Sequence, residues 1–295
     1  MDFETQYLNL LREIRDNGVD KGDRTGVGCR SLWLRTIRHD LANGFPLLTT
    51  KRVFTKGVLA ELLWFLTGDT NIQPLVQQGV SIWTDWPLAR YNKTTGSEVS
   101  KQMFEQWIAE DDRFAKSWGD LGPVYGKQWV AWEGMDGEKH NQIQSVVDTL
   151  KTDPNSRRIL FSGWNVPDLP DMALVPCHVL YQFSTIGGRL NAALYQRSCD
   201  TLLGVPFNIA SLAFLTHMIA HQTGYEPGEI VWVGADVHLY SNHWEQVEEQ
   251  LSREPRPLPK LSFARKPDSI FGYTREDFLI EGYAPHEAIK AKVAV

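Results

Sequence analysis

Residues 172–211 of the chain read MALVPCHVLYQFSTIGGRLNAALYQRSCDTLLGVPFNIAS. β-branched and aromatic residues alternate with other side chains over 179–184, which favours a strand. Gly187-Gly188 predicts a hairpin turn, and residues 190–195 predict the returning strand. Because an antiparallel hairpin brings its two ends together, we expect Cys177 to lie close to Arg197 and Ser198. Everything else in the chain is interpreted outward from this hairpin.

Cys177 is the first candidate for chemistry. A nearby guanidinium favours the thiolate, which is the nucleophilic form of cysteine. The alternative is a buried cysteine that packs as a small apolar side chain, which is the commoner state of this residue type. Polar residues lie at both ends of the hairpin, so the sequence supports a reactive cysteine and a packed cysteine about equally. Spacing alone leaves both interpretations open.

Composition excludes several classes of protein. The chain has 295 residues, 42% hydrophobic and 22% charged, with a net charge of −6, as in soluble globular proteins. The acidic balance argues against a stable nucleic-acid partner, and no apolar run is long enough to cross a membrane. The amino terminus does not have the pattern of a signal peptide. Three scattered cysteines predict neither a disulfide framework nor a metal site, which fits a cytoplasmic protein.

Glu61 lies within the apolar run VLAELLWFL, residues 58–66, which predicts a buried helix. Its neighbours leave almost no polar face for the carboxylate to join. A buried carboxyl group is costly unless it is paired, and its pKa is often raised. Glu61 is therefore a better functional candidate than a typical surface glutamate.

Two arginine-containing segments could bind a phosphate. Residues 21–29, KGDRTGVGC, form a glycine-rich loop that carries Arg24, and residues 156–159 place Arg157 and Arg158 before a strand. Taken singly, each is more simply a solvated turn or strand end.

The remaining pattern gives coarser expectations. Residues 87–117 predict a polar surface insertion with a helix over 103–108, and the glycine-rich residues 119–129 suggest a binding loop. Residues 204–208 predict a loop before an apolar helix over 209–222. Residues 236–243 predict a polar turn whose two histidines lack a zinc-ligand spacing.

Taken together, the motifs resemble the thymidylate synthase family, over the chain from the Arg24 loop to the last valine. They occur in this order: GDRTGVG, FPLLTTKR, ELLWFLTGDTNI, GDLGPVYGKQW, SRRI, MALVPCH, LYQRSCDTLLGVPFNIAS, HLYSNH, LSREPRPLP and AIKAKVAV. The resemblance implies an α+β fold in a single catalytic domain over residues 1–295, with a large mixed sheet flanked by helices. It also implies a homodimer in which the two sheets pack back to back.

The reaction implied by the resemblance is the reductive methylation of dUMP to dTMP. The co-substrate 5,10-methylenetetrahydrofolate would supply carbon and hydride and leave as dihydrofolate. Cys177 would attack carbon 6 of the uracil, since a covalent adduct makes carbon 5 a good nucleophile. The phosphate would be bound by Arg24, Arg197 and Ser198 of one subunit and by Arg157 and Arg158 of the other.

The resemblance assigns further roles to individual side chains. Asn208 would read the pyrimidine edge, because an amide both donates and accepts hydrogen bonds. His238 and Tyr240 would hold the 3′-hydroxyl of the deoxyribose. The groups expected to organise water, protons or folate are Glu61, Tyr125, His178, Asp200, Lys51, Trp83, Trp86 and Val295.

Several residues depart from the usual family pattern, and they motivate an alternative. These are Leu212, Ala193, Gly163, Ala235, Lys292 and Val175, which replace residue types more common at those positions. None removes a catalytic group, but they leave open that water replaces hydride in the last step. The alternative product is 5-hydroxymethyl-dUMP, with release of tetrahydrofolate. A non-catalytic nucleotide- or RNA-binding protein is a third hypothesis, against which the set Cys177, Glu61, Arg197 and Asn208 argues.

Overall fold

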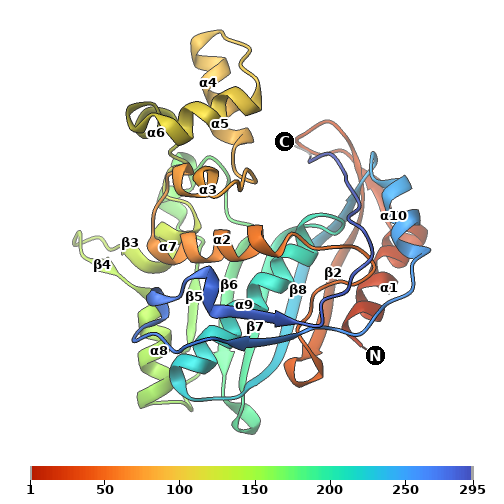
Figure 1. The fold of residues 1–295 in the computed structure, drawn as a ribbon, viewed down its shortest axis with the longest axis vertical. Helices are drawn as coiled ribbons and strands as arrows, with labels where there is room; N and C mark the ends of the chain where they lie inside the picture. Colours follow the sequence, from red (N-terminus) through yellow and green to blue (C-terminus); the bar gives the residue numbers. More distant parts are fainter. Residues whose placement is uncertain (1, 294–295) are drawn as a thin grey trace.

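The computed structural model describes residues 2–293, and its centre is a mixed six-stranded sheet (Figure 1). The strands are ordered β1-β2-β8-β7-β6-β5, and β7 pairs with β8 in parallel while the other neighbours are antiparallel. Their bounds are β1 Val19–Lys21, β2 Cys29–Asp40, β5 Leu160–Ser162, β6 His178–Ser184, β7 Leu190–Asp200 and β8 Pro227–Tyr240. The expected α+β class with a large mixed sheet is confirmed.

The rest of the chain forms helices and two small sheets. The helices are α1 Phe3–Asn17, α2 Thr55–Thr67, α3 Gln73–Gln77, α4 Asp85–Thr95, α5 Lys101–Glu110, α6 Asp112–Trp118, α7 Tyr125–Ala131, α8 Gln142–Thr152, α9 Gly204–Thr223 and α10 Trp244–Leu251. Two small sheets pair β3 Trp132–Glu133 with β4 Lys139–His140, and β9 Lys260–Phe263 with β10 Phe278–Glu281.

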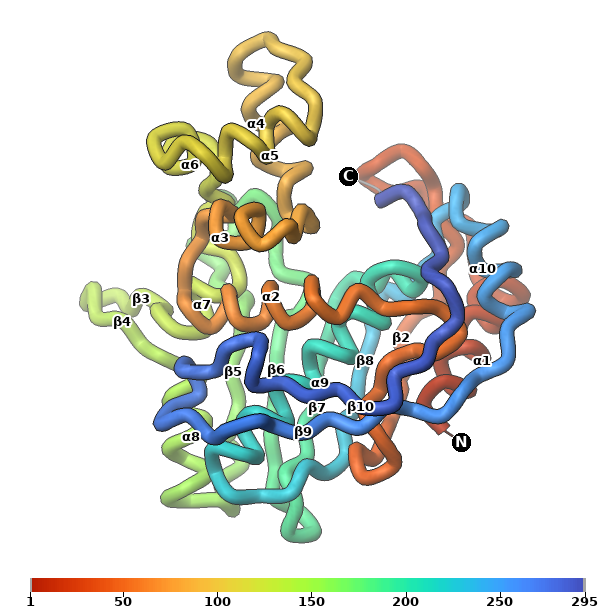
Figure 2. Tube along the Cα trace, viewed as in Figure 1, coloured from red at the N-terminus to blue at the C-terminus, as the bar shows by residue number. Residues whose placement is uncertain are grey.

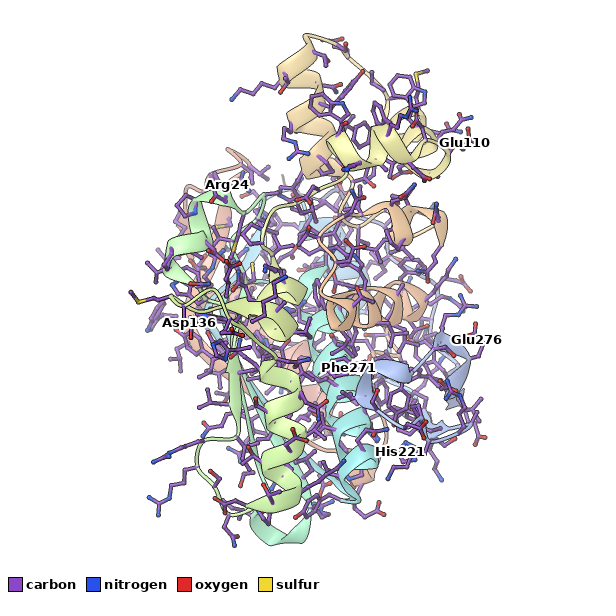
Figure 3. The ribbon with its side chains drawn as sticks, turned by 90° about the vertical axis from the view of Figure 1, so that its left-hand side faces the viewer. Arg24, Glu110, Asp136, His221, Phe271 and Glu276 are labelled. Carbon is purple, nitrogen blue, oxygen red and sulfur yellow. The ribbon has the colours of Figure 1, made fainter. Side chains whose placement is uncertain are left out.

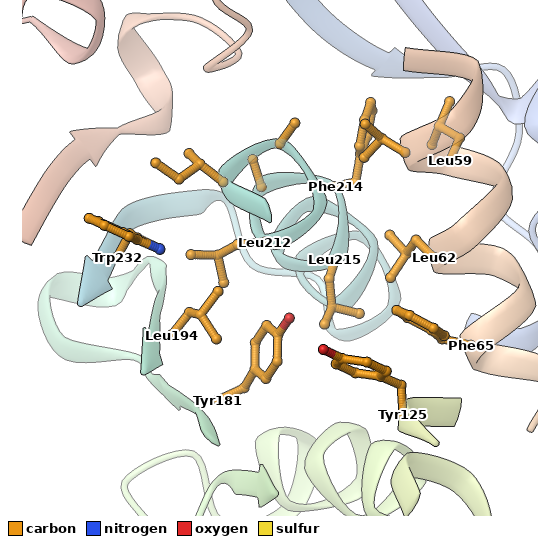
Figure 4. Close-up of a cluster of buried hydrophobic side chains, with 14 of the residues drawn as sticks. Leu59, Leu62, Phe65, Tyr125, Tyr181, Leu194, Leu212, Phe214, Leu215 and Trp232 are labelled. Atoms are coloured by element: carbon orange, nitrogen blue, oxygen red, sulfur yellow. The ribbon is translucent and has the colours of Figure 1, made fainter. Parts of the chain in front are cut away.

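The core forms where α9 lies between the sheet and α2. The α9 helix is apolar around most of its circumference, which is typical of a helix covered on all sides. Figure 4 shows its side chains meeting those of α2 on one side and those of the sheet on the other. The labelled residues of this cluster are Leu212, Phe214 and Leu215 from α9, Leu59, Leu62 and Phe65 from α2, Tyr125 from α7, and Tyr181, Leu194 and Trp232 from the sheet.

Buried Glu4 ties α1 to the polar bend at residues 49–52. Its carboxylate accepts hydrogen bonds from the backbone amides of Thr49 at 2.8 Å and Thr50 at 2.6 Å. The carboxy-terminal segment runs beside the same stretch (Figure 2), where the Tyr283 hydroxyl donates to the Leu48 carbonyl at 2.8 Å. This stretch is thus fixed from both ends of the chain.

The central hairpin is confirmed, but three expected loops are regular structure. Residues 204–208 form the first turn of α9, where Pro206 is tolerated because the first helical amides need no acceptor within the helix. Residues 236–240 are not a polar turn: they continue β8, and Asp236, His238 and Tyr240 occupy alternate positions on it. Residues 125–129, expected in a binding loop, begin α7.

Residues 85–118 fold as a helical unit of α4, α5 and α6 that stands off from the body of the molecule (Figure 3). The expected helix over 103–108 is part of α5, while α4 and α6 were not foreseen. Aromatic rings hold the three helices together, with Tyr91 against Trp118 at 4.9 Å and Trp107 against Phe114 at 5.3 Å between centroids. The polar surface of the segment hid this small aromatic core.

The contact between α2 and α7 generates a stability prediction. A Cβ atom added at Gly126 would lie 2.4 Å from the Phe65 carbonyl oxygen and 2.8 Å from the Phe65 Cα, so the helices would have to separate. We expect Gly126→Ala to lower the free energy of unfolding by about 1–3 kcal/mol, measured by urea denaturation. Gly22→Ala is the control, because a Cβ there meets nothing within 4 Å. Equal stability of the two variants would contradict close packing at Gly126.

Candidate active site

A cavity of about 580 Å³ opens between α2, α7, the residue 21–29 loop and the ends of β7 and β8. A pocket of this size suits a small-molecule ligand. Most of the candidate residues line it, although they come from distant parts of the sequence: Arg24, Glu61, Trp83, Trp86, Tyr125, Cys177, His178, Arg197, Ser198, Asp200, Asn208, His238 and Tyr240.

Cys177 lies where the hairpin prediction placed it. The Arg197 amide donates to the Cys177 carbonyl at 2.9 Å, and Arg197 Nη2 lies 4.0 Å from Cys177 Sγ. The same guanidinium donates to the carbonyls of Val175 at 2.7 Å and Pro176 at 2.9 Å. The cysteine amide donates to the Tyr125 hydroxyl at 2.7 Å. The thiol is thus held by backbone and side-chain contacts on both sides.

Arg197 favours the thiolate of Cys177, as expected, but burial outweighs its effect. Burial raises the pKa of Cys177, while the positive charge of Arg197 and the Tyr125 hydroxyl lower it by less. Desolvation disfavours a charged form whenever the compensating charge is too weak to replace water. Cys177 is therefore predominantly a thiol at neutral pH.

Glu61 is buried on α2, as the apolar run predicted, with 7% of its surface exposed. Trp83 Nε1 donates to Glu61 Oε1 at 2.8 Å, and the Trp83 and Trp86 rings lie 5.3 Å apart at the same side of the pocket. Burial raises the pKa of Glu61 to about 8, and the bond from Trp83 offsets only part of that shift. Glu61 is therefore mainly protonated at neutral pH and can donate a proton.

Asn208 is oriented by a residue that the sequence analysis did not select. Gln196 Nε2 donates to Asn208 Oδ1 at 2.9 Å, while Trp232 Nε1 donates to Gln196 Oε1 at 2.8 Å. A buried glutamine in the middle of a strand was the available signal, since buried amides have bonded partners. His178 also hydrogen-bonds Asn208, and burial lowers the pKa of His178 to about 4, so its ring is neutral.

Four candidates lie elsewhere. Arg157 and Arg158 are exposed at the start of β5 and do not line the cavity of their own chain. Lys51 is buried beneath the pocket, where its amine donates to the Leu202 carbonyl, and burial lowers its pKa to about 8. Val295 lies outside the described residues; Val293, near it in sequence, lines the cavity.

The described residues contain neither a metal-binding cluster nor a membrane-spanning helix. No group of three or more histidine, cysteine, aspartate or glutamate side chains over 2–293 has an arrangement that could hold a metal ion. In the same range, no helix combines the length and the apolar character needed to cross a bilayer.

Comparison with known proteins decides the family. The thymidylate synthase family model matches residues 5–295. The chain belongs to the thymidylate synthase family. The thymidylate synthase of Rhizorhabdus wittichii is 55% identical over 303 residues, covering 99% of this chain and 98% of the relative. The thymidylate synthase of Zymomonas mobilis is 55% identical over 294 residues, with 99% of both chains covered.

This membership confirms the expected family, and the relatives' shared name favours methylation over hydroxymethylation. The positions that depart from the usual thymidylate synthase pattern agree with it. Leu212 is fully buried in the core beside Leu194 (Figure 4), and Ala235 is buried in β8. None of the six departures is among the described residues that line the cavity: Gly163, Val175, Ala193, Leu212, Ala235 and Lys292.

The raised pKa of Glu61 predicts a pH dependence of stability. The unfolded chain releases this proton near the ordinary pKa of 4.5, whereas the folded protein keeps it until about pH 8. Because the folded state binds more protons in that window, the free energy of unfolding falls as pH rises from 4.5 to 8 and then levels off. We expect Glu61→Gln to remove this slope, making the variant more stable than the wild type by a few kcal/mol at pH 8.

Urea denaturation of both proteins from pH 5 to pH 9 measures the difference, and Glu105→Gln on α5 is a control outside the pocket. A difference that is independent of pH would contradict a protonated Glu61.

Proposed function

We propose that the chain converts dUMP to dTMP with Cys177 as the nucleophile and 5,10-methylenetetrahydrofolate as co-substrate. One observation carries the proposal: a cysteine, a guanidinium, a base-reading amide and a protonated carboxyl group converge on one cavity. Cys177 Sγ would form a bond to carbon 6 of the uracil, leaving an enolate whose carbon 5 attacks the one-carbon unit. The folate would transfer that unit by breaking its carbon–nitrogen bond, and carbon 5 would lose its proton. Hydride from the tetrahydrofolate thus formed would complete the methyl group, after which the thiolate leaves and dihydrofolate is released.

Phosphate binding and proton transfer would fall to separate groups of the cavity. The phosphate would be bound by Arg24, Arg197 and Ser198, which line the cavity near the thiol. Two neutral proton carriers, Glu61 and Tyr125, lie at the same site, since burial raises the pKa of each. We assign them, together with neutral His178, to proton transfer and to ordering water around the pyrimidine.

Base recognition would fall to Asn208. Gln196 fixes its amide so that Oδ1 is the acceptor side, leaving the NH₂ group to donate to uracil O4 while Oδ1 accepts from N3–H. We assign the 3′-hydroxyl to His238 and Tyr240. The folate side would be formed by Trp83 and Trp86, and Asp200 would order folate and water. We also assign Lys51 and Val295 to folate binding.

We further propose a cytoplasmic homodimer of single-domain chains, in which residues 1–295 form one domain and residues 87–117 are a surface insertion. The described cysteines are all free, as expected in a reducing compartment. One face of the sheet lacks a helical cover, and Thr36, Val233, Tyr195 and Leu180 lie in register across it. Trp33 is 70% exposed and Tyr195 is 38% exposed there. Back-to-back packing would cover this face, and Arg157 and Arg158 would reach the partner's phosphate site.

Oligomeric state tests the dimer. We expect sedimentation equilibrium to give twice the chain mass of 33.6 kDa, and Tyr195→Lys to shift the protein toward the monomer because it places a charge in the proposed apolar contact. Met135→Lys on the exposed β3–β4 turn is the control. A monomeric wild type at micromolar concentration would refute the dimer.

The reaction is tested by incubating the protein with dUMP and 5,10-methylenetetrahydrofolate and identifying both products by mass spectrometry. We expect dTMP with dihydrofolate. Cys177→Ala should lower turnover by more than about 10⁴-fold, because no other group can form the covalent adduct, while calorimetric binding of dUMP stays within about threefold. Cys199→Ala is the matched control, because Cys199 is a free, buried cysteine that does not line the cavity. Hydroxymethyl-dUMP with tetrahydrofolate, or normal turnover by Cys177→Ala, would overturn the proposal.

A further inference from the structure

The carboxylate of Asp236 joins Lys21 and His238 in the wall of the cavity. Its Oδ2 accepts from Lys21 Nζ, and its Oδ1 lies 3.2 Å from His238 Nδ1. All three residues line the cavity, but neither the motif analysis nor the proposed reaction gives Asp236 or Lys21 a role.

These contacts determine where His238 carries its proton. Nδ1 lies 3.2 Å from both the backbone oxygen and Oδ1 of Asp236. Hydrogen bonds from His238 and Lys21 hold the pKa of Asp236 well below its usual range, so the carboxylate is ionised. Both oxygens can then only accept, which requires a hydrogen on Nδ1. In the neutral ring, Nε2 is left with its lone pair.

An Nε2 lone pair suits a hydroxyl group as its partner. Asp236, His238 and Tyr240 occupy alternate positions of β8, and the His238 and Tyr240 rings meet edge to face at 5.1 Å. A ligand hydroxyl between them can donate to Nε2 and accept from the tyrosine. If the ring carried its proton on Nε2 instead, His238 would compete with Tyr240 as a donor and the hydroxyl would lose its acceptor.

Stability alone gives the Lys21–Asp236 pair little value. The two side chains are 45% and 28% exposed, and ion pairs with that exposure contribute little to stability. Their placement is more informative, because Lys21 ends β1 three residues before Arg24 while Asp236 lies on β8. The pair therefore connects the arginine loop to the strand that bears His238.

We propose that Asp236, supported by Lys21, is a positioning residue that fixes the tautomer of His238 and makes the pocket selective for nucleotides with a free 3′-hydroxyl. This inference rests on the proposed assignment of dUMP to the cavity. It goes further by naming the residues that set selectivity for the sugar.

The test compares dUMP with 2′,3′-dideoxyuridine 5′-monophosphate, which lacks only the 3′-hydroxyl. Calorimetry measures both dissociation constants without requiring turnover. We expect Asp236→Asn to raise Kd about tenfold for dUMP and less than about twofold for the dideoxy nucleotide. Lys21→Gln should lower the ratio of the two dissociation constants, that of the dideoxy nucleotide over that of dUMP, by about threefold. This variant provides the test if Asp236→Asn folds poorly.

Asp20→Asn is the matched control. Asp20 lies on β1 beside Lys21, and its substitution breaks the ion pair with Arg30 of β2 at 2.7 Å. Asp20 does not line the cavity. Both Kd values should stay at the wild-type level. ¹⁵N spectra of histidine-labelled protein, assigned with His238→Gln, should show Nδ1–H in the wild type and a shift toward Nε2–H in Asp236→Asn.

Equal weakening of both nucleotides by Asp236→Asn and by Lys21→Gln would overturn the inference, because it would indicate a purely structural role. So would a wild-type protein that binds the two nucleotides equally. A wild type that prefers the 3′-hydroxyl through Asp236 but forms no dTMP would refute the proposed reaction and leave the inference standing.

Discussion

The pairing of β6 with β7 is the constraint on which the site depends. Backbone hydrogen bonds between these strands set Arg197 beside Cys177, and the guanidinium then binds the carbonyls of Val175 and Pro176. The parallel pairing of β7 with β8 then places Ser198 opposite Asp236 and Asp200 opposite His238. The thiol, the guanidinium and the groups that we propose to bind the sugar are therefore fixed by one sheet register. A slip of one residue would turn each of them to the opposite face.

Burial shapes the chemistry of these groups more than charge does. It raises the pKa of Cys177 despite a guanidinium at 4.0 Å, raises that of Glu61 to about 8, and lowers that of His178 to about 4. All three side chains are thus mainly neutral at neutral pH. Such a site avoids the cost of buried unpaired charge, and a bound phosphate brings its own charge to the arginines.

Local pattern was sufficient for some elements and insufficient for others. Alternation and a Gly-Gly turn predicted the hairpin, and a continuous apolar run predicted α2 with buried Glu61. Residues 236–240 were misassigned because polar side chains on alternate positions imitate a turn when the strand faces a cavity instead of a core. Gln196 and Asp236 were missed for a related reason. Their importance lies in contacts with Asn208, Lys21 and His238, and most of these partners come from other elements that only the folded sheet brings near.

The segment from Ile72 to Gly119, which contains α3 to α6, begins and ends at the same place. The Ile72 amide donates to the Gly119 carbonyl at 3.0 Å. A segment whose ends meet can be lengthened, shortened or exchanged during evolution while the strands stay in place. Trp86 lies in α4, within this segment, and also lines the cavity. Sequence changes in the segment would therefore reach the side of the pocket that we propose for folate before the side that we propose for the nucleotide, so that the binding of one ligand could change independently of the other.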